Sequence, residues 1–175
     1  IVEVRVPNPE AHFWLDMKDG LRFVTGEPLL VTLSATVGIW HMFHYGALTM
    51  QILFATRELH LNEHQVGLCY MIMGIGTIVA SMLGNRFSRW FGPGPCLILG
   101  FAVCGAGWMQ LGFAPVNAWG IASFIFMLLC YSFGAVLIFV NMLALRQAVT
   151  PEGLMGRMTS TVRWLILLPA GPGAL

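Results

Sequence analysis

The sequence contains little charge. Only 10% of its 175 residues are Asp, Glu, Lys or Arg, whereas a typical soluble domain contains about 25%. No charged residue of these types occurs at positions 28–56, 64–85 or 90–145, which are runs of 29, 22 and 56 residues. A helix of about 20 apolar residues crosses a bilayer, and a soluble core needs no such lengths. The sequence therefore predicts a polytopic α-helical membrane protein in which the longest run crosses twice.

Other absences exclude classes of function. The net charge is +1 and no basic stripe is present, so we expect no nucleic-acid partner. The four cysteines form no Cys-x-x-Cys pair and lie inside apolar runs, which favours packing over metal binding or disulfides. We expect no metal and no cofactor. The cysteines are Cys69, Cys96, Cys104 and Cys130.

The two ends of the sequence predict an internal fragment. It begins without an initiator Met or a signal peptide. Its last apolar run starts at Trp164 and contains 12 residues. A run of that length is too short to span a bilayer. We therefore expect a chain that is cut at both ends.

Residues 1–27 are predicted to form a cytoplasmic connector with a short amphipathic helix. Phe13, Met17, Leu21 and Val24 follow at spacings of four, four and three, which places them on one helix face. Such a helix is expected to lie flat on the membrane surface and to lead into the first span. A flexible tail is the alternative.

Residues 28–175 are predicted to hold five spans. Their approximate bounds are 29–55, 65–83, 96–113 and 118–145, with a truncated fifth at 161–175. Polar loops separate most of them, at 57–64, 84–95 and 146–163. Residues 114–117 carry the only turn signal inside the longest apolar run.

The basic residues predict the orientation. Eight of the nine fall on one side of the predicted topology: Arg5, Lys18, Arg22, Arg86, Arg89, Arg146, Arg157 and Arg163. Arg57 alone falls on the other side. Because cytoplasmic loops carry the excess of Lys and Arg, the first side is expected to be cytoplasmic and the loop at His60 to face out.

Small residues predict where helices approach one another. Gly76, Ala80 and Gly84 stand four apart in the second span, a spacing that lets two backbones come close. The third span repeats this more loosely at Gly100, Gly105 and Gly107, where the general abundance of glycine in membrane helices is an equal explanation.

Histidine supplies the ionisable side chains of the apolar spans, which contain no acidic residue. Ionisable groups inside a bilayer are costly and mark functional sites. His41, His44 and Gln51 fall on nearly one face of the first span, and with Thr36 and Trp40 they are candidates to line a polar substrate cavity. Hydrogen bonding to a neighbouring helix is the alternative, and proton coupling by the histidines is a weaker one.

Two further polar features have competing interpretations. Asn141 is a cavity candidate in the fourth span, although Asn141 and Ser132 favour helix bridging over substrate contact. In the outer loop, His60 and His64 have a spacing that can chelate a metal, but they lack the His-Glu-x-x-His pattern of metalloproteases. A solvated loop is the favoured interpretation there.

Two predicted inner loops carry distinctive patterns. Residues 84–92 (GNRFSRWFG) have glycine at each end for a tight return and arginines that suit helix C-termini. Thr150, Pro151 and Glu152 are typical of a helix start, and the short helix is expected to stop at 153–156. An ordinary charged loop is the alternative for each.

These loops resemble a known family. Residues 141–163 (NMLALRQAVTPEGLMGRMTSTVR) are similar to the loop between helices ten and eleven of the major facilitator superfamily, and more narrowly to its bacterial macrolide and enterobactin exporters. Residues 20–24 (GLRFV) resemble that branch's approach to helix seven, and residues 84–92 resemble the inner-loop signature between helices eight and nine. Asn85 stands where the stronger signature has Asp, so no salt-bridged gate is expected there.

The resemblance implies an all-α membrane protein comprising helices seven to eleven, the last incomplete, of a 12-helix major facilitator fold. Its C-terminal half would rock against a missing N-terminal half around a central site. The implied function is secondary active transport, with proton-coupled export of small amphiphilic molecules across the bacterial inner membrane. The implied partners are the lipid bilayer, a small-molecule substrate and the missing half, which would carry any proton-coupling acid.

The resemblance also implies gating residues in the inner loops. These are Gly84, Asn85, Arg86, Arg89, Arg146, Gln147, Pro151, Gly156, Arg157 and Arg163. No catalytic residue is implied. A non-transporting scaffold or receptor with the same fold is the main alternative, and a membrane metalloenzyme that uses the outer-loop histidines is a remote one.

Overall fold

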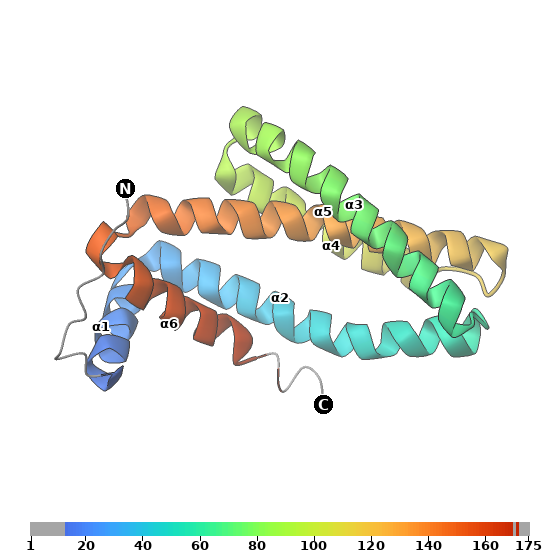
Figure 1. Cartoon of the computed structure of the whole chain (residues 1–175), viewed down its shortest axis with the longest axis horizontal. Coiled ribbons are helices and arrows are strands. Elements are labelled where there is room, and N and C mark those ends of the chain that lie inside the picture. The colour runs from blue at the N-terminus through green and yellow to red at the C-terminus, as the bar shows by residue number, and fades with distance from the viewer. Residues whose placement is uncertain (1–12, 170, 172–175) are drawn as a thin grey trace. The chain divides into compact units, whose positions relative to one another are not determined.

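The computed structural model describes residues 13–169 and residue 171, and this part of the chain is helical with no strand (Figure 1). The helices are α1 (Phe13–Gly26), α2 (Pro28–Leu53), α3 (Glu63–Phe91), α4 (Pro93–Gly112), α5 (Ala118–Val149) and α6 (Met155–Leu167). A π-helical turn, Phe54–Glu58, follows α2, and a 3-10 turn, Glu152–Leu154, precedes α6.

Several helices are long and apolar enough to cross a membrane. Within the described residues, α3, α4 and α5 meet this condition with 29, 20 and 32 residues. A fourth span results if α1 and α2, which meet at an angle of 101°, count as one bent span. The all-helical prediction is therefore confirmed, and the chain is an integral membrane protein.

Two compact units make up the chain. The connector unit contains α1, the first part of α2 up to Tyr45, and the segment from Thr150 onward with α6. The bundle unit runs from Gly46 to Val149 and contains the end of α2 with α3, α4 and α5.

Helices α4 and α5 of the bundle unit approach closely at three glycines. A Cβ atom on Gly100 would lie 2.8 Å from the Gly134 carbonyl oxygen, and one on Gly134 would lie 2.5 Å from Cys104 Sγ. Gly107 makes a similar approach to Cys130. Gly105 faces away with nothing within 4 Å, so only part of the predicted glycine pattern of this span makes a helix contact.

The small-residue ridge of α3 packs against α5, as predicted. A Cβ atom on Gly76 would lie 2.7 Å from Leu129 Cδ2, and a Cβ atom on Gly84 would lie 3.4 Å from Val136 Cγ1. Ala80, between these glycines, is buried. Replacement of the glycines by larger residues would separate the two helices.

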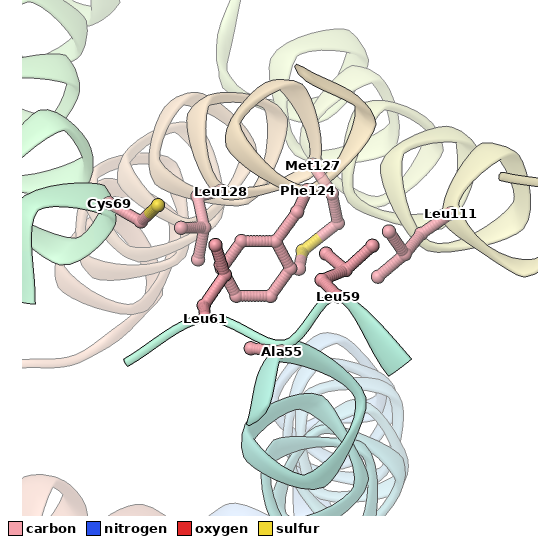
Figure 2. Packing of buried hydrophobic residues seen from close by; sticks show 8 residues of the cluster. All are labelled: Ala55, Leu59, Leu61, Cys69, Leu111, Phe124, Met127 and Leu128. Carbon is pink, nitrogen blue, oxygen red and sulfur yellow. The ribbon is translucent and has the colours of Figure 1, made fainter. Parts of the chain in front are cut away.

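An apolar cluster fills the bundle unit at the end where the π-helical turn lies (Figure 2). The Phe124 ring of α5 is fully buried between Leu59 and Leu61, which flank the turn that leads into α3. The other members are Ala55, Cys69, Leu111, Met127 and Leu128. This cluster ties the connection between α2 and α3 to α4 and α5.

The segment 84–95 differs from the expected loop. It is helical through Phe91 and again from Pro93, so Gly92 alone connects α3 and α4. Gly92 has φ +81°, a left-handed value that favours glycine, and Pro93 suits the first turn of α4. The arginines at positions 86 and 89 predicted a loop. The dipole of a helix favours positive charge at its C-terminus, so α3 continues through these arginines.

The segment around Gly153 also differs from the expectation. The short helix does not stop at 153–156, because the 3-10 turn continues into α6 from Met155. The turn expected at 114–117 is confirmed, because α4 ends at Gly112 and α5 begins at Ala118. Asn117 Oδ1 accepts a hydrogen bond from the Trp119 backbone amide at 2.8 Å, which satisfies one amide of the first turn of α5.

Candidate functional site

Four rings gather on one stretch of α2: Trp40, His41, His44 and Tyr45. The indole of Trp40 stacks on the imidazole of His44, with ring centroids 5.6 Å apart and an interplanar angle of 11°. Tyr45 lies 6.0 Å from the His41 ring and 5.8 Å from the His44 ring, centroid to centroid. The spacing of three and four residues along a helix brings these rings together. This stretch therefore offers both hydrogen-bonding nitrogens and aromatic faces.

His41 is buried and bonded to its own helix. Its Nδ1 lies 3.0 Å from the carbonyl oxygen of Val37, one turn earlier. Because a carbonyl only accepts, His41 Nδ1 donates the proton of this hydrogen bond, which does not use Nε2.

Gln51 lies near the end of α2, in the bundle unit. Its side chain is 3% exposed, and its Nε2 has no hydrogen-bond partner within the described part of the chain. A buried amide donor without a partner costs about 1–3 kcal/mol, so such a group needs an explanation. His41, His44 and Gln51 all lie on α2, as predicted, whereas Thr36 is exposed.

Asn141 on α5 bridges two helices. Its Oδ1 accepts a hydrogen bond from Ser88 Oγ on α3 at 2.6 Å, and its Nδ2 donates to the Leu137 carbonyl at 2.8 Å. The residue is 0% exposed. Ser132 bridges the same two helices, because its hydroxyl lies 2.7 Å from the Leu128 carbonyl and 3.1 Å from that of Met73. Both residues therefore make the interhelical contacts that the sequence favoured for them.

The candidate gating residues of the bundle unit cluster at one end of α3 and α5, which the Ser88–Asn141 hydrogen bond holds together. Gly84 is buried between the helices, whereas Asn85 and Arg89 are exposed on α3. The Arg86 guanidinium lies 5.6 Å above the centre of the exposed Trp90 ring. Near the end of α5, Arg146 is half-buried and Gln147 is exposed.

The other gating candidates belong to the connector unit. Arg157 Nη1 on α6 lies 3.3 Å from Asp19 Oδ2 on α1, an ion pair whose side chains are 39% and 56% exposed. Directly beside it, a Cβ atom on Gly20 would collide with Thr161 Oγ1 and would lie 2.9 Å from the Arg157 carbonyl oxygen. The predicted connector and last inner loop therefore meet. Pro151, Gly156 and Arg163 are exposed.

Sequence reasoning assigned no helix contact to Asp19 or Gly20. No pattern within one segment identifies an ion partner 138 positions away in the sequence. The signal for Gly20 was present: a glycine in a helix interior costs about 1 kcal/mol relative to alanine and is retained for close approach.

The outer-loop histidines are exposed. His60 adopts φ 52° in the turn before α3, and His64 lies in the first helical turn. Asn62 caps α3, because its Oδ1 accepts from the Gln65 amide and Gln65 Oε1 accepts from the Asn62 amide, each at 2.9 Å. The described residues contain no group of three or more His, Cys, Asp or Glu that could hold a metal ion.

Long apolar helices, helix contacts at small residues and buried polar groups within a span define a polytopic α-helical membrane protein. The chain belongs to the Major Facilitator Superfamily, whose family model matches residues 3–173. It is 30% identical over 95 residues to the uncharacterized MFS-type transporter YceJ of Bacillus subtilis (strain 168). That match covers 54% of this chain but only 23% of the relative. No solved structure matches the chain.

Proposed function

We propose that the protein to which this chain belongs is a secondary active transporter that exports small amphiphilic molecules in exchange for protons. The proposal rests on membership of the Major Facilitator Superfamily and on the likeness to an MFS-type transporter. The observation that carries it is the buried, unpartnered amide of Gln51 in an apolar helix, which a substrate or another part of the protein would satisfy.

In this proposal, α2 is helix seven of the fold and lines the central cavity. His41 and His44 supply imidazole nitrogens and Gln51 supplies an amide, so they bind polar groups of the substrate. The stacked rings of Trp40 and His44 present flat faces to its apolar part. Asn141 instead keeps α5 beside α3, because both ends of its amide are used there.

Proton coupling requires a group that exchanges protons between the two states. The apolar spans of this sequence contain no Asp or Glu, so we propose that the coupling acid lies in a first half of the full-length protein. Alternating access then results from the rocking of two helix bundles around the shared site. We place the protein in the bacterial inner membrane, with the arginine-rich ends of α3 and α5 in the cytoplasm.

The inner segments are proposed to latch one state. Arg86 and Arg89 at the end of α3, and Arg146 at the end of α5, present cations that an opposing bundle can bind. Arg157 on α6 pairs with Asp19 on α1, and we propose that this contact keeps α1 beside α6 in the latched state. The main alternative is a scaffold or receptor with the same fold, which would move no substrate.

The test is transport by the full-length protein in everted membrane vesicles. A fluorescent amphiphilic cation is supplied outside, and acidification of the lumen drives its uptake if the protein exports in exchange for protons. The proposal predicts uptake above that of vesicles without the protein, and its collapse when a protonophore is added. Uptake that survives the protonophore but needs a sodium gradient contradicts proton coupling. Uptake equal to that of protein-free vesicles for a panel of such probes contradicts export of amphiphiles.

A further inference from the structure

An open groove of about 360 Å³ lies within the connector unit, among α1, α2 and the end of α6. Leu21 and Thr25 of α1 lie at one end, Ser34, Ala35 and Gly38 line it along α2, and Leu165 contributes from α6. Ligand sites in proteins have volumes of roughly 300–1,000 Å³, so this groove is large enough to hold part of a ligand. We call it the α2 groove.

The shape of the α2 groove follows from small side chains on one face of α2. Ser34, Ala35 and Gly38 leave a hollow between the larger Val31 and Ile39, which also line it. From Val31 to Ile39 the helix rises about 12 Å, so the hollow is elongated along the helix axis. Its walls are almost entirely apolar, which suits a hydrocarbon chain.

Thr25 and Ser34 carry the hydroxyl groups of this apolar wall, and the Thr25 hydroxyl donates to the Leu21 carbonyl of its own helix. Ser34 is 5% exposed, lines the groove, and its Oγ has no hydrogen-bond partner in the part of the chain that the structure describes. A serine on a helix usually donates to the carbonyl four residues earlier, and an unsatisfied buried hydroxyl is costly. An occupant that is wholly hydrocarbon, such as an apolar side chain, would leave this hydroxyl unsatisfied. An occupant with an ester oxygen would accept its hydrogen bond.

One lysine, Lys18, lies on the side of α1 that borders the groove. Lys18, Leu21 and Thr25 follow at spacings of three and four, so the Lys18 side chain lies on the stripe of α1 that borders the groove. Lys18 is exposed and forms no ion pair among the described residues, whereas Asp19 is neutralised by Arg157. Because α1 and α2 meet at 101°, α1 lies across the end of α2. An α2 helix that spans the bilayer therefore places Lys18 near the lipid headgroups.

We propose that the α2 groove binds one acyl chain of an anionic glycerophospholipid, with an ester oxygen on Ser34 Oγ and the phosphate toward Lys18. Ser34 lies six residues beyond Pro28, about 9 Å along α2. The headgroup layer on each side of a bilayer is roughly 5–8 Å thick, so an α2 that enters the bilayer at Pro28 places Ser34 at the depth of the ester groups. The site requires a membrane but does not depend on transport.

The test uses the full-length protein in bilayers that contain a phospholipid with a photoactivatable group on one acyl chain. After irradiation, the labelled peptides are identified by mass spectrometry. Labelling is expected on residues 31–39 and 165–169 and is compared with the exposed apolar face of α3 at Ile75 and Ile78, which reports ordinary lipid contact. An anionic and a zwitterionic probe with the same chains are used in parallel, and the anionic probe is expected to label the groove about fivefold more.

Three variants test the parts of the site. Ala35→Trp fills the groove and should lower labelling of residues 31–39 about tenfold, while Thr32→Trp, on an exposed position of α2 outside the groove, should not. Ser34→Ala should lower it about fivefold. Lys18→Gln should remove the preference for the anionic probe and leave the zwitterionic signal unchanged.

Several results would overturn the assignment. Equal labelling of the groove and of the α3 face would mean ordinary lipid contact only. Absence of groove labelling in the unmodified protein would mean that another part of the protein covers it. If Ala35→Trp does not fold, Ser34→Ala and Lys18→Gln still decide the matter, because unchanged labelling in both would exclude the proposed ester and phosphate contacts.

Discussion

Asp19 on α1 and Arg157 on α6 form an ion pair of 3.3 Å that joins two segments far apart in the sequence. Both segments were predicted to lie on the cytoplasmic side, and their contact agrees with a shared side. The pair sits beside the tightest approach between these helices, at Gly20. The ion pair and the close approach at Gly20 are two contacts between α1 and α6, and the two can be tested separately.

We expect Arg157→Ala to change stability little and transport strongly. The two side chains are 39% and 56% exposed, so the ion pair contributes less than about 1 kcal/mol to the free energy of unfolding. If Arg157 holds the inner end in its working arrangement, transport at equal membrane insertion falls well below that of the unmodified protein. Arg22→Ala, which removes an exposed arginine of α1, is the control. Normal transport by Arg157→Ala would exclude the proposed role of this arginine.

Gly20→Ala should destabilise the protein by about 1–3 kcal/mol, because the new methyl group meets the Thr161 hydroxyl and the Arg157 carbonyl. Gly26→Ala is the matched control on the same helix, with nothing within 4 Å of the added atom. The readout is the midpoint of thermal unfolding of the purified full-length protein in detergent. Equal midpoints for the two variants would show that α1 does not pack on α6 as described.

Ser88→Ala should cost about 0.6–1.7 kcal/mol, the range measured for hydrogen bonds between membrane helices. It removes the donor to Asn141, a residue with no exposed surface. Ser81→Ala is the control, because the Ser81 hydroxyl is exposed and bonds within its own helix to Thr77. Unfolding of the purified protein measures both. A Ser88→Ala variant of unchanged stability but weakened substrate binding would instead place Asn141 in the cavity.

Gly100→Ala should separate α4 from α5 and lower stability by about 1–3 kcal/mol, since the added carbon would lie 2.8 Å from the Gly134 carbonyl. Gly105→Ala on the same helix meets nothing within 4 Å and should be neutral or slightly stabilising. Thermal unfolding again compares the two. Similar losses for both would mean that the effect arises from the helix backbone and not from the contact with α5.

The apolar runs predicted the long helices α2 to α5. Five spans were expected, whereas three described helices, or four with the bent pair of α1 and α2, are long and apolar enough to cross a membrane. Pro115 with Asn117 marked the turn inside the longest run. The end of α3 was placed too early because charge was taken as a loop signal. The arginines there are exposed on a helix that continues to Gly92, whose left-handed backbone makes the turn.

Of the contacts in the candidate site, only those between residues of the same helix could be predicted from the sequence. Spacing placed His41 and His44 on one stretch of α2, where the rings of both contact Trp40. Contacts between helices, such as Ser88 with Asn141 or Asp19 with Arg157, depend on which helices are neighbours and in which register. No periodicity within one segment contains that information. The buried Gln51 amide has no hydrogen-bond partner among the described residues, so its role could not be predicted from contacts within this part of the chain.

The central claim is that this chain is part of a carrier with alternating access, and counterflow tests it without knowledge of the coupling ion. The full-length protein is reconstituted into vesicles loaded with an excess of an unlabelled amphiphilic cation, and a trace of the labelled compound is added outside. A carrier predicts transient accumulation of label above the equilibrium level, and Gln51→Leu should diminish it. The experiment is repeated with a panel of amphiphilic cations. If every labelled compound only equilibrates, at the rate seen in protein-free vesicles, this result would contradict the account.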